Sequence, residues 1–185
     1  MSDTWLGIDT STSYLCLALW SPEGGLLAES VERVDRRHAV RFVATLEGVL
    51  ERAGRSRREL TAIAAGGGPG SYTGLRVGGA AAKGLASALG VPLAGVDTLA
   101  AMAFRGLDEG EEGVVAIDAR RGNAYLGRYR RHGDEVFTLE APHKAPLLET
   151  RSRHRGIRFL LDVPPDPGYV ARQANSGVPY RPLYL

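Results

Sequence analysis

Three short apolar runs open the chain, and turn-forming residues separate them. The runs span residues 5–10, 14–20 and 26–34, and a Ser-Pro-Glu-Gly-Gly cluster at 21–25 divides the second from the third. Apolar runs of this length, bounded by polar or glycine-rich turns, predict β-strands. Three consecutive strands with such tight connections are typical of an antiparallel meander.

The spacing of apolar residues changes after position 36. From 37 to 53 they recur at every third or fourth position, which predicts an amphipathic helix with Asp35 as its N-cap and Gly54 as its stop. We then expect a strand at 60–65, a helix at 71–89, a strand at 93–96 and a helix at 97–104. This alternation after a meander predicts a mixed sheet covered by helices, an α/β fold.

An acidic, glycine-rich segment at 106–113 predicts a boundary between two lobes, residues 1–105 and residues 106–185. Three more strands are expected at 114–118, 124–130 and 136–139, with a turn at 131–134. The prolines of segment 161–168 argue against regular structure there. Ile8-Asp9 and Ile117-Asp118 each end an expected strand before a polar turn, which indicates a duplication.

The composition is that of an ordinary globular protein. Of 185 residues, 44% are hydrophobic and 24% are charged, which argues against disorder. The apolar runs are far shorter than the roughly 20 residues that span a bilayer, and the N-terminus does not resemble a signal peptide. The single cysteine, Cys16, excludes an internal disulfide. We therefore expect a cytoplasmic protein without a membrane partner.

The net charge of +2 is too small to imply nucleic-acid binding by itself, but the arginines are unevenly distributed. One cluster lies within residues 52–58, and a second lies with His154 within residues 151–158. Either cluster fits a solvated surface. Clustered guanidinium groups also fit contact with nucleic-acid phosphates, although no RNA-binding motif with stacking aromatic residues accompanies them.

Two segments fit phosphate chemistry and also a purely structural role. The turn at Asp9-Thr10-Ser11-Thr12 offers a carboxylate for hydrated Mg²⁺ and hydroxyls for phosphate oxygens, or it is a hairpin capped by its own side chains. The segment 66–74 holds five glycines and a proline ahead of a helix, which suits a phosphate or close packing. Its ending is not that of a Walker A motif.

The helix at 71–89 carries small residues at every fourth position, namely Gly74, Gly78, Ala82 and Ala86. Glycine in a helix costs roughly 1 kcal/mol relative to alanine, so this stripe requires a compensating close contact. Another helix that packs against the stripe would supply that contact. That helix belongs either to this chain or to another subunit.

No residue cluster predicts a metal site or a catalytic site. His38 opens the first helix, but the positions three and four residues later hold Arg41 and Phe42, which are not metal ligands. The chain also lacks neighbouring Ser, His and Asp or Cys and His residues that would indicate a nucleophile. Because catalytic residues need not be near each other in sequence, this argues only weakly against an enzyme. The expectation is nevertheless no metal, no resident cofactor and no catalytic residue.

Together these motifs resemble the bacterial TsaB (YeaZ-type) family, which takes part in making threonylcarbamoyladenosine in tRNA. The glycine-rich stretch at 68–78 is the most specific match, and order and spacing agree over roughly residues 5–130. The other matching stretches are Ile8–Thr12, His38, Gly95–Leu99, Ile117–Gly122 and a C-terminal Pro182–Leu185 element. The segment 141–178 is shorter than is usual for this family.

The resemblance implies an actin/Hsp70-like ATPase (ASKHA) fold with two RNase H-like lobes, the second shortened. It implies a non-catalytic scaffold subunit of the complex that forms N6-threonylcarbamoyladenosine at position 37 of tRNAs reading codons that begin with adenine. The catalytic relative, TsaD, has a His-x-x-x-His metal pair on its first helix. Here the second position is Phe42, so the resemblance also implies that this metal centre is lost.

The resemblance further implies that the first two helices pair with those of TsaD in a heterodimer. An ATPase subunit, TsaE, completes the complex, the isolated chain forms a homodimer, and tRNA contact is indirect. The implied interface residues are His38, Arg41, Phe42, Thr45, Gly74, Leu75, Gly78, Ala82, Leu85, Ala86 and Leu89. Weak residual ATP or ADP binding would use Asp9, Thr10, Ser11, Thr12, Gly68 and Gly70.

Two alternatives remain. An ATP-hydrolysing or phosphoryl-transferring enzyme would use Asp9 for Mg²⁺ and residues 68–70 for phosphate. A metallopeptidase is the second, because the superfamily has been classified in that way, but the missing second ligand argues against it.

Overall fold

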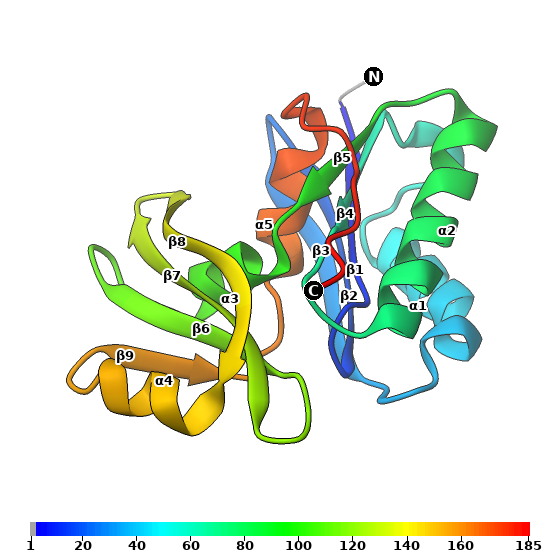
Figure 1. Ribbon diagram of the computed structural model, residues 1–185. Coiled ribbons are helices and arrows are strands. Elements are labelled where there is room, and N and C mark those ends of the chain that lie inside the picture. The colour runs from blue at the N-terminus through cyan, green and yellow to red at the C-terminus, as the bar shows by residue number, and fades with distance from the viewer. Residues whose placement is uncertain (1–2) are drawn as a thin grey trace.

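The computed structural model describes residues 3–185, which form two β-sheets with helices between and beside them (Figure 1). The first sheet has the strand order β3-β2-β1-β4-β5, and the second has the order β8-β7-β6-β9. Both sheets are mixed, and the second is smaller by one strand. The predicted α/β fold with two lobes, the second shortened, is confirmed.

The first three strands form the predicted antiparallel meander. They are β1 (Trp5–Asp9), β2 (Tyr14–Ser21) and β3 (Gly25–Arg33). Trp5 lies opposite Trp20 and Asp9 lies opposite Cys16 in the β1–β2 pair. Strand β1 is buried almost throughout because it lies in the middle of the sheet with helices on both faces.

The first lobe continues with the predicted alternation of helices and strands. Its elements are α1 (His38–Arg52), the 3-10 turn η1 (Arg57–Glu59), β4 (Ala62–Gly66), α2 (Tyr72–Leu89), β5 (Leu93–Val96) and α3 (Thr98–Gly106). Ser71 caps α2 by accepting a hydrogen bond from Gly74 N. Gly90 ends α2 with a φ of 68°, a left-handed conformation that glycine adopts readily.

The second sheet is built from β6 (Glu112–Asp118), β7 (Asn123–His132), β8 (Glu135–Pro146) and β9 (Arg158–Leu161). The short helix α4 (Leu147–Arg153) lies on its outer face, over a small apolar cluster centred on Val114 and Leu126. This second lobe repeats the plan of the first. Strand β6, like β1, pairs antiparallel with the next strand and parallel with a later one, as the two Ile-Asp motifs indicated.

The end of the chain returns to the first sheet. Helix α5 (Pro167–Arg172) packs against β1 and β2, and the 3-10 turn η2 (Gln173–Asn175) packs against β4 and β5. The last residues run along the edge of β5, where Pro179 pairs with Ala94 and Leu183 N donates to Gly67 O. The division into residues 1–105 and 106–185 stays a prediction, but this last segment packs with the first sheet.

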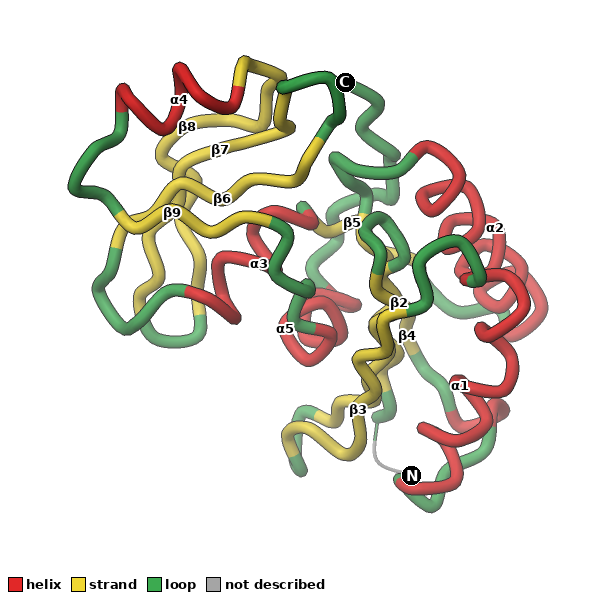
Figure 2. Tube along the Cα trace, turned by 90° about the horizontal axis from the view of Figure 1, so that it is seen from below, coloured by secondary structure: helices red, strands yellow, loops and turns green. Residues whose placement is uncertain are grey.

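Two apolar cores hold the elements together. One lies between the first sheet and the helices α1 and α2, and the other surrounds α3 and α5. Figure 2 shows α3 and α5 between the two sheets. Gly7 of β1 shows how close this packing is, because a Cβ there would lie 2.5 Å from the backbone nitrogen of Ala171 in α5. None of the helices within residues 3–185 is both long and apolar enough to cross a bilayer.

Two local predictions are wrong. Asp35 does not cap α1, since Arg37 occupies the N-cap position and Asp35 sits in a turn with a φ of 51°. Segment 161–168 is only partly irregular: Leu161 ends β9, and Pro167 begins α5. Proline is favourable in the first turn of a helix because the N–H that it lacks has no partner there.

Candidate functional site

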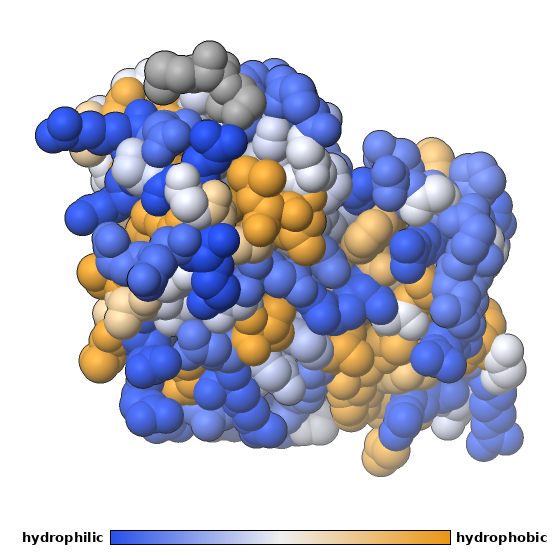
Figure 3. Space-filling model, turned by 180° about the vertical axis from the view of Figure 1, so that it is seen from behind, coloured by the Kyte–Doolittle hydropathy of each residue, from blue (hydrophilic) through white to orange (hydrophobic). Residues whose placement is uncertain are grey.

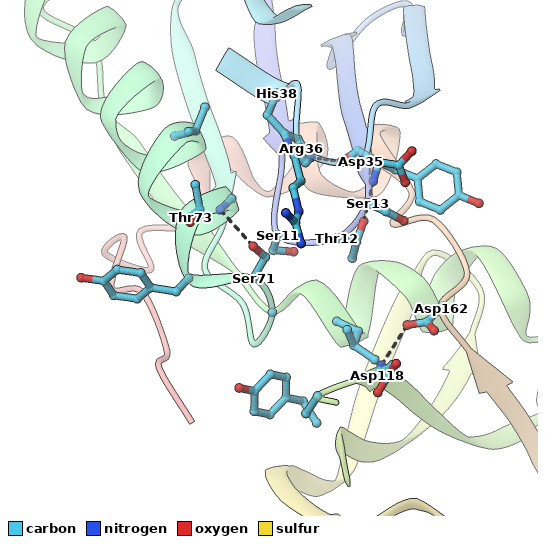
Figure 4. Close-up of a pocket in the computed structure, with 18 of the residues that line it drawn as sticks. Ser11, Thr12, Ser13, Asp35, Arg36, His38, Ser71, Thr73, Asp118 and Asp162 are labelled. Carbon is cyan, nitrogen blue, oxygen red and sulfur yellow. Dashed lines mark hydrogen bonds between the residues drawn. The ribbon is translucent and has the colours of Figure 1, made fainter. Parts of the chain in front are cut away.

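A cleft of about 880 Å³ lies between the two lobes (Figure 4). Arg36, Ser71 and the polar turn after β1 line it from the first lobe, while Asp118 and Asp162 line it from the second. Hydroxyls, carboxylates and a guanidinium group therefore face one hollow. Such a cleft is the geometric default for a small-ligand site.

Backbone strain is concentrated at the rim of this cleft. Among residues 3–185, the non-glycine residues with positive φ are Asp35, Arg120, Arg121 and Asp162. Three of these four line the cleft, and Arg121 adjoins Arg120 in the β6–β7 turn. A left-handed conformation is unfavourable for a residue with a side chain, so the surrounding structure must stabilise it.

Asp9 lies at the end of β1 but does not line the cleft. Its Oδ1 accepts hydrogen bonds from Ser11 N at 2.8 Å and Ser11 Oγ at 2.6 Å, and its Oδ2 accepts one from Thr98 Oγ1 at 2.8 Å. The side chain is 1% exposed. Burial raises the pKa of Asp9, and these hydrogen bonds and His38 act in the opposite direction. The carboxylate is thus occupied by its own chain, contrary to the expected role at a phosphate or Mg²⁺.

The glycine-rich loop after β4 is also occupied by the chain itself. Gly67 N donates to Val96 O, Gly68 N donates to Thr98 Oγ1, and Ser71 N donates to Ser11 O. A Cβ on Gly70 would overlap the Ser11 carbonyl oxygen. The loop therefore serves close packing, one of its two predicted roles. Of the residues expected to bind nucleotide, Ser11, Thr12 and Gly70 line the cleft, whereas Asp9, Thr10 and Gly68 do not.

His38 and Phe42 occupy the positions of the expected lost metal pair. His38 is 6% exposed, and its Nε2 donates to Tyr14 O at 3.2 Å, since a carbonyl oxygen can only accept. Phe42 is buried in the core between α1 and the first sheet. No group of three His, Cys, Asp or Glu residues within the described part of the chain is arranged to hold a metal ion. The absence of a metal stays a prediction.

The stripe of small residues on α2 faces the first lobe and not a partner, so the expectation of an intersubunit contact there is wrong. Cβ atoms on Gly74 and Gly78 would overlap Thr10, and Ala82 and Ala86 lie in the core beneath the helix. Thr10 Oγ1 also donates to Gly74 O at 2.7 Å. The glycines let α2 approach the turn after β1.

Most of the interface residues expected from the resemblance are buried within the chain. The buried ones are His38, Phe42, Thr45, Gly74, Leu75, Gly78, Ala82 and Ala86. Arg41 is exposed and forms an ion pair with Glu32, while Leu85 and Leu89 are partly exposed. The two predicted helices are therefore in place, but the faces assigned to the partner are mostly those that pack against the sheet.

The opposite faces of α1 and α2 are exposed and rich in apolar or small side chains. Val40 is 79% exposed, Val43 is 63% exposed and Tyr72 is 60% exposed. We call this surface the outer helix face, and it consists of Ala39, Val40, Val43, Ala44, Tyr72, Val77, Ala80 and Gly84. Apolar side chains interrupt the hydrophilic surface over α1 at the left edge of Figure 3.

The sequence did carry a signal for this face. The apolar periodicity of residues 37–53 includes Val43 together with Leu46 and Val49, but in the structure Leu46 and Val49 are buried whereas Val43 is 63% exposed. The ring of Tyr72 lies 5.3 Å from the ring of Tyr184 in the C-terminal segment, at a tilt of 51°, which is a contact between distant parts of the sequence. Sequence spacing alone could not reveal that contact.

Comparisons with known proteins match this chain to proteins of tRNA threonylcarbamoyladenosine biosynthesis. The family model described as tRNA N6-adenosine threonylcarbamoyltransferase, TsaD, matches residues 19–143. The tRNA threonylcarbamoyladenosine biosynthesis protein TsaB of Escherichia coli is 35% identical over 145 residues, covering 74% of this chain and 62% of the relative. TsaB of Bacillus subtilis is 36% identical over 163 residues, covering 85% and 70%.

A solved structure extends the similarity over the whole chain. YeaZ from Pseudomonas aeruginosa superposes with a TM-score of 0.86 at 28% identity, covering 99% of this chain and 100% of that one. The match to the Escherichia coli relative spans less than two thirds of its length. The structural match therefore covers more of this chain than the sequence match to the Escherichia coli relative does.

Proposed function

The chain belongs to the TsaB (YeaZ) family, and from this membership we propose that it is a non-catalytic subunit of the cytoplasmic machinery that makes threonylcarbamoyladenosine in tRNA. In this proposal it stabilises the transferase TsaD by pairing α1 and α2 with the equivalent helices of that subunit. The modified position is adenosine 37 of tRNAs that read codons beginning with adenine.

The exposed apolar surface on α1 and α2 carries the proposal. Val40, Val43 and Tyr72 are each more than half exposed on neighbouring helices, and small residues such as Ala80 and Gly84 are exposed further along α2. Exposed apolar patches rimmed by polar residues are typical of protein–protein interfaces. Ala44, Ala80 and Gly84 would let partner helices approach closely.

The groups that would carry an enzymatic reaction are engaged elsewhere in this chain. Asp9 accepts hydrogen bonds from Ser11 and Thr98, and His38 donates to a backbone carbonyl. Phe42, at the position of the second metal ligand in TsaD, packs in the core. These contacts support a subunit without its own catalytic residues, metal or resident cofactor.

The proposed partners follow from the same surface. TsaD covers the outer helix face in the complex, and a second copy of this chain covers it in isolation. The ATPase subunit TsaE joins the assembly through another surface. Because TsaD and a second copy of this chain would cover the same apolar face, the homodimer forms only when TsaD is absent.

Substitution of Val43 by Asp tests this proposal. Val43 is 63% exposed, so an aspartate there is tolerated by the fold but places a charge in the proposed interface. We expect Val43→Asp to lower capture of TsaD by at least tenfold in a pulldown and to yield a monomer in size-exclusion chromatography with light scattering.

Leu148→Asp is the matched control, because Leu148 is an 80% exposed aliphatic residue on α4, away from α1 and α2. It should retain the homodimer and the capture of TsaD. Undiminished TsaD capture by a folded Val43→Asp variant would contradict the proposed pairing. An equal loss in both variants would mean that added negative charge, and not the outer helix face, is responsible.

In this proposal the cleft binds nucleotide only weakly. Ser11, Thr12 and Gly70 line the cleft near the N-terminus of α2, which attracts anions. We expect Mg-ATP to bind weakly and without turnover in isothermal calorimetry. Hydrolysis by the isolated chain would instead support the alternative of an ATP-hydrolysing enzyme.

A further inference from the structure

The second lobe presents a cluster of arginines that the proposed function does not use. Segment 141–158 contains five Lys or Arg side chains and one carboxylate, a formal charge of +4, whereas the whole chain carries +2. Arg151, Arg153 and Arg155 are all exposed on α4 and the turn that follows it. Positive charge is therefore concentrated on this part of the surface.

The two arginine clusters of the sequence differ in how far acidic groups neutralise them. In the cluster at 52–58, Arg55 pairs with Glu59 at 3.2 Å, Arg57 pairs with Glu47 at 3.1 Å, and Arg52 donates to Glu29 O. In the cluster at 151–158, the ion pair is Arg153 with Glu149 at 2.7 Å. That pair is more than 60% exposed on both sides and therefore weak in water.

One arginine of α4 lies over an aromatic ring of the second sheet. The guanidinium of Arg151 lies 5.2 Å from the centre of the Phe159 ring. Val114 of β6 lies opposite Arg128 of β7 on one side and opposite Phe159 of β9 on the other. The side chains of Arg128 and Phe159 are therefore on the same face of the sheet. Stacking fixes the guanidinium plane and leaves its N–H groups free to donate at the edge.

This surface differs from its counterpart in the first lobe. Helices α1 and α4 follow the third strand of their lobes in the same order, but α1 has 15 residues and an exposed apolar face, whereas α4 has 7 residues and exposed arginines. Planar guanidinium groups match the oxygens of phosphate. Proximity to a polyanion would also release the counterions that phosphates hold.

We propose that Arg128, Arg151, Arg153 and Arg155, which we call the α4 arginine patch, directly bind the phosphate backbone of RNA. The proposal rests on the proposed function, because that function supplies tRNA as the polyanion, and it makes the tRNA contact direct. Recognition by these groups is independent of base sequence, since guanidinium–phosphate pairs carry no base information.

The test uses fluorescence anisotropy of an unmodified tRNA transcript with the isolated chain between 50 and 200 mM salt. The patch variant carries Arg151→Gln, Arg153→Gln and Arg155→Gln. Its matched control carries Arg52→Gln, Arg57→Gln and Arg58→Gln, which removes the same charge from the other cluster. Circular dichroism melts confirm that both variants fold.

We expect the patch variant to bind tRNA at least tenfold more weakly at the lower salt, with the control within about twofold of the unsubstituted chain. The slope of log K against log salt should fall by roughly 2 to 3 in the patch variant, since each phosphate contact contributes about 0.7 to 0.9. Equal losses in both variants, or none in the patch variant, would overturn the proposal.

A competition experiment distinguishes RNA from an acidic protein as the ligand of the α4 arginine patch. Polyglutamate matched to the tRNA in total charge should compete poorly with the tRNA, and equally strong competition would assign the patch to acidic protein. Capture of TsaD is measured on the same patch variant and should be unchanged. If the unsubstituted chain captures TsaD but does not bind tRNA, or if the patch variant binds tRNA as tightly as the unsubstituted chain, this inference alone is rejected. Failure of the Val43→Asp test rejects the proposed function.

Discussion

The hydroxyl of Tyr129 donates a hydrogen bond of 2.6 Å to the carboxylate of Asp97, and this bond joins the second sheet to the N-terminus of α3. Asp97 also caps α3 by accepting from Leu99 N. Burial raises the pKa of Asp97 to about 6, while the hydrogen bonds from Tyr129 and the helix backbone lower it. Burial likewise raises the pKa of Tyr129 well above its usual range.

This carboxyl group predicts a pH dependence of stability. A pKa of 3.8 in the unfolded chain and about 6 in the folded chain means that the folded state binds the extra proton between these values. The contribution of Asp97 to the free energy of unfolding should therefore fall as pH rises from about 4 to about 6, and stay level above. Because Asp97 keeps partial solvent contact, we expect a change of about 1–2 kcal/mol.

Asp97→Asn should remove this slope, because asparagine does not titrate and still caps the helix. Urea unfolding at pH 4, 5, 6 and 7 on both proteins isolates the contribution of Asp97 as their difference. A difference that grows in the opposite direction, with the unsubstituted chain gaining stability relative to the variant as pH rises, would contradict the assignment.

A pair of glycines on α2 tests where the small-residue stripe packs. Gly78→Ala should destabilise the chain by about 1–3 kcal/mol, because its Cβ would overlap Thr10 Oγ1. Gly84→Ala on the outer face meets nothing within 4 Å and should stabilise the helix by about 0.5–1 kcal/mol. Urea unfolding measures both values. A neutral Gly78→Ala variant would mean that the stripe is not packed against this chain.

The sequence predicted where α1 and α2 begin and end better than it predicted what each face of these helices contacts. Helical periodicity located α1 and α2 to within a residue, because the core residues Phe42, Leu46 and Val49 recur at helical spacing. The stripe from Gly74 to Ala86 marked a close contact, yet its partner, Thr10, lies 64 residues from Gly74 in sequence. Spacing shows that a backbone approaches closely but does not show which backbone it is.

The chemistry at Asp9 could not be decided from sequence for a similar reason. A carboxylate followed by hydroxyls fits both a phosphate site and a capped turn. The decisive contact is Thr98, which belongs to the start of α3 and donates to Asp9 Oδ2. The strained residues Arg120 and Asp162 are far apart in sequence and line the cleft together because β6 pairs with β9 in the second sheet.

The contacts of Arg172 predict that its packing against aromatic rings contributes more to stability than its ion pair. Its guanidinium lies 4.8 Å from the Phe104 ring and 5.4 Å from the Trp20 ring, and its side chain is 12% exposed. The ion-pair partner Asp134 is 82% exposed. Arg172→Ala should therefore cost about 2–3 kcal/mol through lost packing, and Asp134→Ala less than about 1 kcal/mol.

Urea unfolding of the two single variants and the double variant gives the coupling energy of Arg172 and Asp134, which should be below about 1 kcal/mol. The 2.7 Å hydrogen bond from Arg172 to the backbone carbonyl of Asp134 remains in Asp134→Ala and is lost in Arg172→Ala. Equal costs for the two single variants would show that the ion pair, and not aromatic packing, holds Arg172.

Substitutions of Asp9 test whether its carboxylate has a structural role or binds nucleotide. Asp9→Asn keeps the shape, can still accept from Ser11, and can donate to Thr98 Oγ1, so we expect it to fold with little change in stability at pH 7. Asp9→Ala leaves the hydroxyls of Ser11 and Thr98 without their acceptor in a buried site and should cost about 2–4 kcal/mol. Mg-ATP titration of the folded Asp9→Asn variant should match that of the unsubstituted chain. Because the asparagine variant preserves the fold, a loss of nucleotide binding in it would identify Asp9 as a ligand and contradict the structural role.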